Sequence, residues 1–448
     1  MVRGRLSTPQ LLLTLLAYDL LLLAFLPVII CYLGYRGLVL KRRPGNWRHR
    51  FGLVPRLPRG THPRVWVHAV SAGEMAAARP VLAELRRRFP NSGIALSTHT
   101  HTGLEVARRS CAEADVIFQF PFDWPDVMAL ALWRILPDLI VVMEKELWPN
   151  FLGTGRLLGA CIVAVNGRVS DRMLRRARWA PGFVRWLYLL PHRLCVQSDE
   201  DARRLRVLGL DGDSRIVIAG NTKADTLAER DRTTEAELAS DLRIGQDEMW
   251  LVAGSTHPGE EERIVEAFVK IREQLPSARL LLAPRHLERV PQVSALLAER
   301  GIQVVRRSDG RQEHPEAVVV LDTMGELRAA YAFATIGFVG GTLVPIGGHN
   351  LLEPPAAGVP VAFGPHTENC PDTAGLVLDA GVGICVEDAD ALAVAFLRFA
   401  RDPRLRTDTA RRAQDLIHRQ RGASARCVAA AAALLDKEIG RASCRERV

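Results

Sequence analysis

The chain has 448 residues, of which 48% are hydrophobic and 24% charged, so it can bury a sizeable core and is unlike a disordered chain. Lys and Arg number 59 against 50 Asp and Glu, a charge of +9 that suits an anionic partner: acidic lipid, a phosphorylated substrate or nucleic acid. The 8 cysteines form no C-x-x-C pair, which excludes the common zinc spacings and a dense disulfide framework and favours a reducing, cytosolic compartment.

The first predicted element is a membrane-spanning helix. Leu11–Leu33 is almost wholly apolar, and at ~1.5 Å per residue it covers ~35 Å, enough to cross a bilayer core. Asp19 is the one charge within it, and we expect its carboxyl group to be protonated, to lie near the headgroups or to have a partner. The alternative is a secretory signal peptide, but no small-residue cleavage site follows the apolar run. We therefore assign residues 1–35 to a membrane anchor.

The basic residues around this segment predict its orientation. Arg3 and Arg5 precede it, whereas a larger basic cluster follows it, consisting of Arg36, Lys41, Arg42, Arg43, Arg48 and Arg50. The positive-inside rule then places the body of the protein in the cytoplasm. A second stretch, residues 172–193, mixes Arg with large apolar side chains. It is either a membrane-surface segment or an ordinary helix pair with its apolar side in the core.

After the anchor, short apolar runs alternate with amphipathic ones in the β-α-β rhythm of a parallel sheet. The predicted strands are Arg64–Val70, Gly93–Leu96, Val116–Phe118, Leu139–Met143, Trp250–Ala253, Arg279–Ala283, Ala317–Leu321 and Ile336–Val339, and the predicted helices are Glu74–Phe89, Gly103–Arg109 and one from Pro258. The rhythm restarts after Gly220. The expected fold is therefore α/β, with Rossmann-like domains at 36–219 and 220–440 facing a cleft, and ligands at the carboxyl ends of the strands.

Three carboxylates share one local pattern. Glu74, Glu326 and Glu353 each come three residues after a helix-cap type of residue, and each follows a strand or a glycine run. For each one alone, the pattern is that of a capping box that satisfies backbone N–H groups. Together they mark the ligand face of a parallel sheet, where helix N-termini bind phosphate and carboxylates bind sugar hydroxyls. The set therefore predicts a sugar-nucleotide site.

Other candidates lie at comparable positions. Arg285 ends a predicted strand and either binds a phosphate or forms a surface ion pair, and Lys223 is a second candidate cation. Glu144 and Glu146 follow a strand and either take part in acid–base chemistry or cap the next helix. The glycines of residues 340–348 allow a ligand to approach the backbone, or simply form a tight turn. No metal-ligand cluster and no P-loop motif are present, so we expect no metal dependence.

The blocks HAVSAGE, STHTHTG, MEKELWPN, VQSDEDARRL, GNTKAD, AGSTHPGEEE, APRH, DTMGEL, FVGGTLVPIGGHNLLEP and FGPH, taken in order to about residue 370, resemble the 3-deoxy-D-manno-octulosonic acid (Kdo) transferases of lipopolysaccharide synthesis. Departures are small: MEKELWPN, GNTKAD and HNLLEPP each differ slightly from the family's usual form. The resemblance implies a GT-B fold, CMP-Kdo as donor, a lipid A precursor (lipid IVA) as acceptor, inversion at the anomeric carbon, and neither metal nor cofactor. It also implies a single-pass protein of the bacterial inner membrane.

The resemblance assigns residues one by one. Glu74 matches the family's catalytic base, and Glu144 and Lys223 match groups that stabilise the transition state. The positions matching the CMP site are Pro284, Arg285, Met324, Gly325, Glu326, Asn350, Leu351, Leu352 and Glu353. Two other hypotheses are a GT-B enzyme that uses a different nucleotide sugar and a non-catalytic membrane scaffold. No motif supports nucleic-acid binding.

Overall fold

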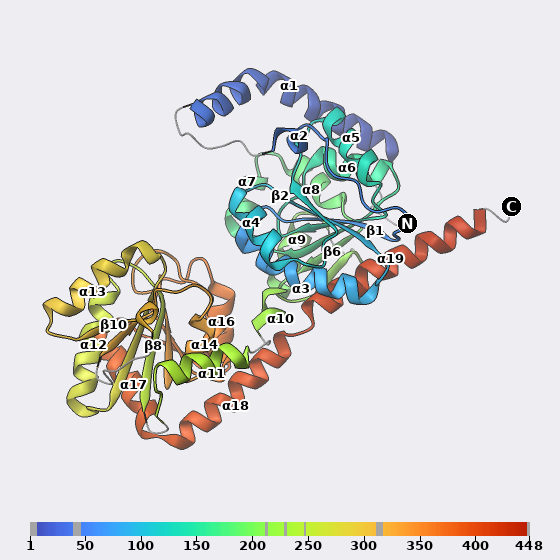
Figure 1. Cartoon of the computed structure of the whole chain (residues 1–448). Helices are drawn as coiled ribbons and strands as arrows, with labels where there is room; N and C mark the ends of the chain where they lie inside the picture. Colours follow the sequence, from blue (N-terminus) through green and yellow to red (C-terminus); the bar gives the residue numbers. More distant parts are fainter. Residues whose placement is uncertain are drawn as a thin grey trace. The chain divides into compact units, whose positions relative to one another are not determined.

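The computed structural model describes residues 7–38, 46–210, 214–227, 231–245, 248–310 and 317–445. The chain forms two compact units: unit 1 runs to Thr226 and resumes at Gly422, and unit 2 is Leu227–Arg421 (Figure 1). Two expected boundaries need correction. The division falls after Thr226 instead of at 219/220, and the second domain ends at Arg421 instead of at 440.

The second correction has a clear physical cause. The C-terminal helix α19 (Ala423–Arg445) buries Cys427, Val428 and Ala431 in the core of unit 1. Its first turn is held by Asp225, whose carboxylate accepts the N–H groups of Gly422 at 2.6 Å and Ser424 at 2.7 Å. The apolar face of α19 therefore returns the end of the chain to the unit in which it begins.

The described residues of unit 1 form a seven-stranded parallel sheet in the order β3-β2-β1-β4-β5-β6-β7. Its strands are β1 Arg64–His68, β2 Gly93–Thr98, β3 Val116–Gln119, β4 Leu139–Met143, β5 Cys161–Gly167, β6 Arg193–Val196 and β7 Ile216–Ile218. Its helices besides α19 are α1 Thr8–Leu38, α2 Trp47–Arg50, α3 Ala72–Arg88, α4 His101–Ser110, α5 Pro125–Ile135, α6 Pro149–Leu157, α7 Asp171–Ala177, α8 Pro181–Leu189, α9 Asp199–Val207 and α10 Lys223–Leu227, the last of which ends in unit 2. The strand order reverses between β1 and β4, and α/β sheets bind ligands at such a switch point.

The described residues of unit 2 form a second parallel sheet of seven strands, in the order β10-β11-β9-β8-β12-β13-β14, with its switch point between β8 and β12. The strands are β8 Met249–Thr256, β9 Ala278–Pro284, β10 Val304–Arg306, β11 Val318–Val320, β12 Ile336–Val339, β13 Val361–Phe363 and β14 Gly383–Cys385. The helices are α11 Arg232–Asp241, α12 Glu261–Gln274, α13 Val290–Glu299, α14 Leu327–Tyr331, α15 Glu353–Ala356, α16 Pro371–Asp379, α17 Ala389–Arg401 and α18 Pro403–Gln420, with short 3-10 turns at Leu287–Arg289 and Arg307–Asp309.

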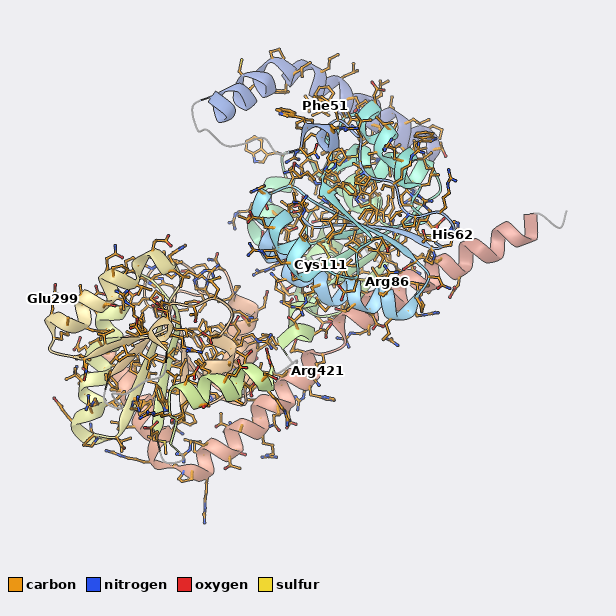
Figure 2. The ribbon with its side chains drawn as sticks, in the orientation of Figure 1. Phe51, His62, Arg86, Cys111, Glu299 and Arg421 are labelled. Carbon is orange, nitrogen blue, oxygen red and sulfur yellow. The ribbon has the colours of Figure 1, made fainter. Side chains whose placement is uncertain are left out.

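Burial explains why the central strands were readable from the sequence. Every residue of Leu139–Met143 is buried, as expected for a parallel strand covered by helices on both faces. Side chains fill the space around the sheet in each unit (Figure 2). The prediction of two Rossmann-like α/β domains is confirmed. The predicted strands agree with the observed ones to within two residues at each end, except that β8 runs three residues past its predicted end.

Helix α1 is long and apolar enough to cross a membrane over Thr8–Val28. It also packs on α6: Leu11 and Leu15 are buried, and a Cβ placed on Gly153 would lie only 2.8 Å from Leu15. Asn150 Nδ2 donates a hydrogen bond to Asp19 Oδ1 at 2.8 Å. Of the three alternatives expected for the Asp19 carboxyl group, the structure shows the one in which it has a partner. One face of α1 therefore packs against the rest of unit 1. Of the basic flanks, Arg3, Arg5, Lys41, Arg42 and Arg43 lie outside the described residues.

Residues 172–193 form a helix pair, α7 and α8. Trp186, Tyr188 and Leu189 of α8 are buried in the core of unit 1, as the alternative of a helix pair with its apolar side in the core predicts. Trp179 between the helices is 91% exposed, and Phe183 is partly exposed. The pair therefore keeps large apolar side chains on the surface as well.

Candidate active site and nucleotide site

Glu74 lies at the switch point of unit 1, in the first turn of α3 directly after β1. Ser71 caps this helix, its Oγ accepting the Glu74 N–H at 3.3 Å. The Glu74 carboxylate accepts the Val70 N–H at 2.8 Å. The predicted Ser71 cap is confirmed, but the Glu74 carboxylate accepts the N–H of Val70 and not that of the N-cap residue, so the reciprocal half of the capping box is absent.

The environment of Glu74 determines its acidity. A helix N-terminus and the Val70 N–H favour the ionised carboxylate, but burial outweighs them and raises the pKa of Glu74 to about 7. Glu146 and Glu144 raise it further, and Lys223 opposes them. A carboxylate with a pKa near the working pH is suited to accept a proton during a reaction.

Glu144 and Lys223 lie beside Glu74 at the same edge of the sheet. Glu144 follows β4, which is the neighbour of β1, and Lys223 begins α10 after β7. Lys223 Nζ lies 3.5 Å from Glu144 Oε1, and both side chains are partly exposed. Glu144 has a left-handed backbone, with φ 53°, a conformation that is costly for a non-glycine residue and gathers at functional sites.

Asn166 is a residue of this site that the sequence prediction missed. It is fully buried at the end of β5 with φ 59°. Its amide Nδ2 donates to Glu144 Oε1 at 3.4 Å, and its Oδ1 accepts the Thr222 N–H at 3.1 Å. Asn166 therefore connects Glu144 to the segment that carries Lys223. The only local signal was an Asn-Gly pair directly after a buried apolar run.

In unit 2, the candidate residues lie at the carboxyl ends of β9, β11 and β12. Pro284 is buried in the last position of β9, and Arg285 follows it with an exposed side chain. Arg285 forms no ion pair with any described residue, so the surface-pair alternative is wrong for this part of the chain. Its guanidinium lies close enough to the histidine of the HNLLEP block to help lower the pKa of His349 to about 4, with burial as the larger cause.

The segment Asn350–Glu353 follows the glycine loop after β12. Leu351 and Leu352 are buried in the core, so only their backbone is available to a ligand. Asn350 Oδ1 accepts the Leu352 N–H at 3.2 Å, and its Nδ2 lies 3.5 Å from Glu353 Oε1. Burial raises the pKa of Glu353, and Arg328 and Arg285 oppose this shift. Arg285 and Asn350–Glu353 are thus brought to one site.

Met324, Gly325 and Glu326 form a turn after β11. Met324 is 79% exposed, and Gly325 has φ 94°. Glu326 accepts from the Thr323 hydroxyl and pairs with Arg307 at 3.1 Å. The cap residue of α14 is Glu326 itself, and that of α15 is Leu352, so the predicted capping boxes at 323–326 and 350–353 are wrong.

The glycine loop is explained by contacts within the protein. A Cβ on Gly340 would lie 2.3 Å from the Ser255 carbonyl oxygen, and one on Gly347 would lie 2.5 Å from Asn369. The buried Glu260 carboxylate accepts N–H groups from Gly341, Thr342 and Leu343, at 2.7, 3.0 and 2.9 Å. The tight-turn alternative therefore accounts for these glycines.

Comparison with solved structures defines the class of fold. The chain is similar to a putative UDP-N-acetylglucosamine 2-epimerase from Listeria monocytogenes, with a TM-score of 0.59, 14% identity, and coverage of 84% of this chain and 97% of that one. It is also similar to the UDP-GlcNAc 2-epimerase from Neisseria meningitidis bound to UDP-GlcNAc, with a TM-score of 0.58, 13% identity, and coverage of 82% and 98%. Two parallel sheets of this kind define a protein of the GT-B fold.

Sequence comparison defines the family. The model of the 3-deoxy-D-manno-octulosonic-acid transferase (kdotransferase) family matches residues 45–226. The 3-deoxy-D-manno-octulosonic acid transferase of Haemophilus influenzae is 31% identical over 377 residues, covering 84% of this chain and 88% of that protein. The Bordetella pertussis protein of the same name is 33% identical over 396 residues, covering 83% and 88%. The chain belongs to the 3-deoxy-D-manno-octulosonic acid (Kdo) transferases, a family of glycosyltransferases.

Proposed function

We propose that this protein transfers Kdo from CMP-Kdo to a lipid A precursor, lipid IVA, with inversion at the anomeric carbon, in lipopolysaccharide core biosynthesis. One observation carries the proposal: Glu74, Glu144 and Lys223 meet at the switch point of unit 1, with the pKa of Glu74 near 7. Transfer to a hydroxyl requires a base that can accept the hydroxyl proton, and a carboxylate with this pKa is suited to that role.

Glu74 is the proposed base. The acceptor hydroxyl is a poor nucleophile until its proton is removed, so its oxygen bonds to the anomeric carbon as the proton passes to Glu74. The bond between the anomeric carbon and the phosphate oxygen breaks on the opposite face, and CMP leaves with the electron pair. Lys223, held beside Glu144 by Asn166, supplies positive charge for the transition state.

Donor binding is proposed for Pro284, Arg285, Met324–Glu326 and Asn350–Glu353. The exposed Arg285 guanidinium suits the phosphate, and the Glu353 carboxylate suits a ribose hydroxyl. No cofactor is proposed. The described residues contain no group of three or more His, Cys, Asp or Glu placed to hold a metal ion, and we expect a chelator to leave the transfer rate unchanged.

The proposed location is the bacterial inner membrane, crossed once by α1, with both units on the cytoplasmic side. The apolar span Thr8–Val28 supports the anchor, and the basic residues after α1 support this side. An anchor of this kind would hold the enzyme next to a lipid acceptor.

The experiment that tests the proposal is transfer from freshly generated CMP-Kdo to a tetra-acylated lipid A precursor, with the products resolved by mass. A gain of Kdo mass is expected. No gain, together with thermal protection by UDP or GDP instead of CMP, would favour a different nucleotide sugar.

Arg285→Ala is expected to weaken CMP binding about tenfold to a hundredfold, because a charge-assisted hydrogen bond contributes roughly 1.5–3 kcal/mol. The measurement is the concentration of CMP that gives half of the maximal rise in melting temperature. Arg300→Ala, an exposed arginine just after α13, is the matched control. Equal CMP affinity in both variants would remove Arg285 from the donor site.

Asn166→Ala is expected to lower kcat at least about tenfold, because Glu144 and Lys223 lose the residue that positions them. The KM for the donor should stay within about threefold of wild type. Asn166→Gly is the control, since glycine adopts positive φ without strain but lacks the amide. If the glycine variant recovers full kcat, the backbone conformation matters and the amide does not.

A further inference from the structure

Aromatic side chains cluster at the carboxyl ends of β2, β3 and β4. Trp148 stacks on His99, with ring centroids 5.4 Å apart and planes at 15°. The buried Phe120 ring lies 5.5 Å from His99 and 5.9 Å from Trp148. Trp148 and His99 are partly exposed, so part of the cluster reaches the surface. Burial, with the nearby Arg50 as a smaller cause, lowers the pKa of His99 to about 4, which leaves its imidazole uncharged at neutral pH.

This cluster adjoins the proposed base. The Trp148 indole N–H donates to Glu146 Oε2 at 2.8 Å. Glu146 and Glu74 follow β4 and β1, which are neighbours in the sheet, and Glu146 is near enough to raise the pKa of Glu74. An occupant of the Trp148 ring would therefore lie next to the Glu146 carboxylate, at the sheet edge that also carries Glu74.

The cluster also adjoins the membrane helix. Asn150, two residues after Trp148, donates to Asp19 of α1 at 2.8 Å. The buried Asp123 carboxylate accepts the N–H groups of Asn150 and Phe151 at 3.1 and 2.8 Å and the Tyr18 hydroxyl of α1 at 3.3 Å. The segment that carries Glu146 and Trp148 therefore connects the end of β4 to α6, the helix that packs on α1.

Resting on the proposed transfer to a lipid-linked sugar, we propose that Trp148, His99 and Glu146 form the subsite that holds the acceptor's pyranose ring. The apolar face of the ring packs on the indole, and Glu146 accepts a hydrogen bond from a hydroxyl or amide N–H of the sugar.

The test is the kinetics of full-length Trp148→Leu, first with saturating CMP-Kdo and varied tetra-acylated lipid A precursor, and then with saturating precursor and varied CMP-Kdo. We expect the acceptor KM to rise at least about tenfold, with kcat and the donor KM within about threefold of wild type. Trp148→Phe, which keeps an aromatic ring, should stay within about threefold of the wild-type acceptor KM. Trp133→Leu, at a 58% exposed tryptophan on α5, is the control and should change neither KM.

An unchanged acceptor KM in folded Trp148→Leu would overturn the subsite, as would an equal rise in both KM values. If Trp148→Leu does not fold, Glu146→Gln decides: an unchanged acceptor KM overturns the subsite, and a rise in the acceptor KM alone supports it. The two proposals fail differently. Wild type that transfers nothing from CMP-Kdo overturns both, whereas active wild type with an insensitive Trp148 overturns only the subsite.

Discussion

Replacing Glu74 with alanine or glutamine is expected to lower transfer ~10²–10⁴-fold, the usual contribution of a general base, while CMP still protects the protein from heat. In wild type, kcat/KM should rise with pH through about 7, because the pKa of the Glu74 carboxyl group is raised to about 7 and the base must be deprotonated. The measurement is initial rate across pH for wild type and both variants. A variant that retains most of its turnover would contradict the assignment.

Two controls separate catalysis from stability at Glu74. Glu84→Ala, on the same helix and paired with Arg87 at 2.5 Å, should leave the rate unchanged. The melting temperature of Glu74→Gln at pH 8 should equal or exceed that of wild type. Because the folded-state pKa of Glu74 lies above its unfolded value, the fold loses stability as pH rises through about 7, and glutamine removes that loss.

Lys223→Met is expected to lower kcat ~10²–10³-fold, because it removes a positive charge placed for the transition state. It should also move the acid limb of the pH profile. Lys223 lowers the pKa of Glu74, so its removal raises that pKa and shifts the limb to higher pH. The measurement is kcat/KM against pH at saturating donor.

Lys145→Met is the matched control for Lys223→Met, since Lys145 is exposed and adjacent to Glu144. It should leave both the rate and the acid limb in place. A slow Lys223→Met enzyme whose acid limb does not move would show that Lys223 acts away from Glu74.

The strands and helices that the sequence predicted were those with long apolar runs or clear caps. Leu139–Met143 and Ile336–Val339 match the structure residue for residue. The three-residue strands β7, β10, β13 and β14 were not predicted, because alternation over three positions carries almost no periodic signal. Strand β11 also has three residues, but it was predicted because it lies within a longer apolar run. Strands β5 and β6 were not predicted either, although each is well buried.

The residues of the candidate site also divide into those that the sequence indicated and those that it did not. The sequence alone indicated the residues that follow strands, Glu74, Glu144 and Arg285, because the carboxyl edge of a parallel sheet is where ligands bind. It also indicated the family through its ordered motif blocks. It did not indicate Asn166, whose role depends on Glu144 and Thr222, residues that approach it only through folding.

What the sequence by itself determined is the kind of the elements with a clear pattern, the apolar N-terminal helix and the chemical type of the candidate residues, since these depend on local patterning. Only the tertiary structure decided that burial outweighs the helix end at Glu74, that Asp19 pairs with Asn150, and that α19 returns to unit 1. Each of these depends on groups far apart in the sequence, whose solvation and partners are set by packing.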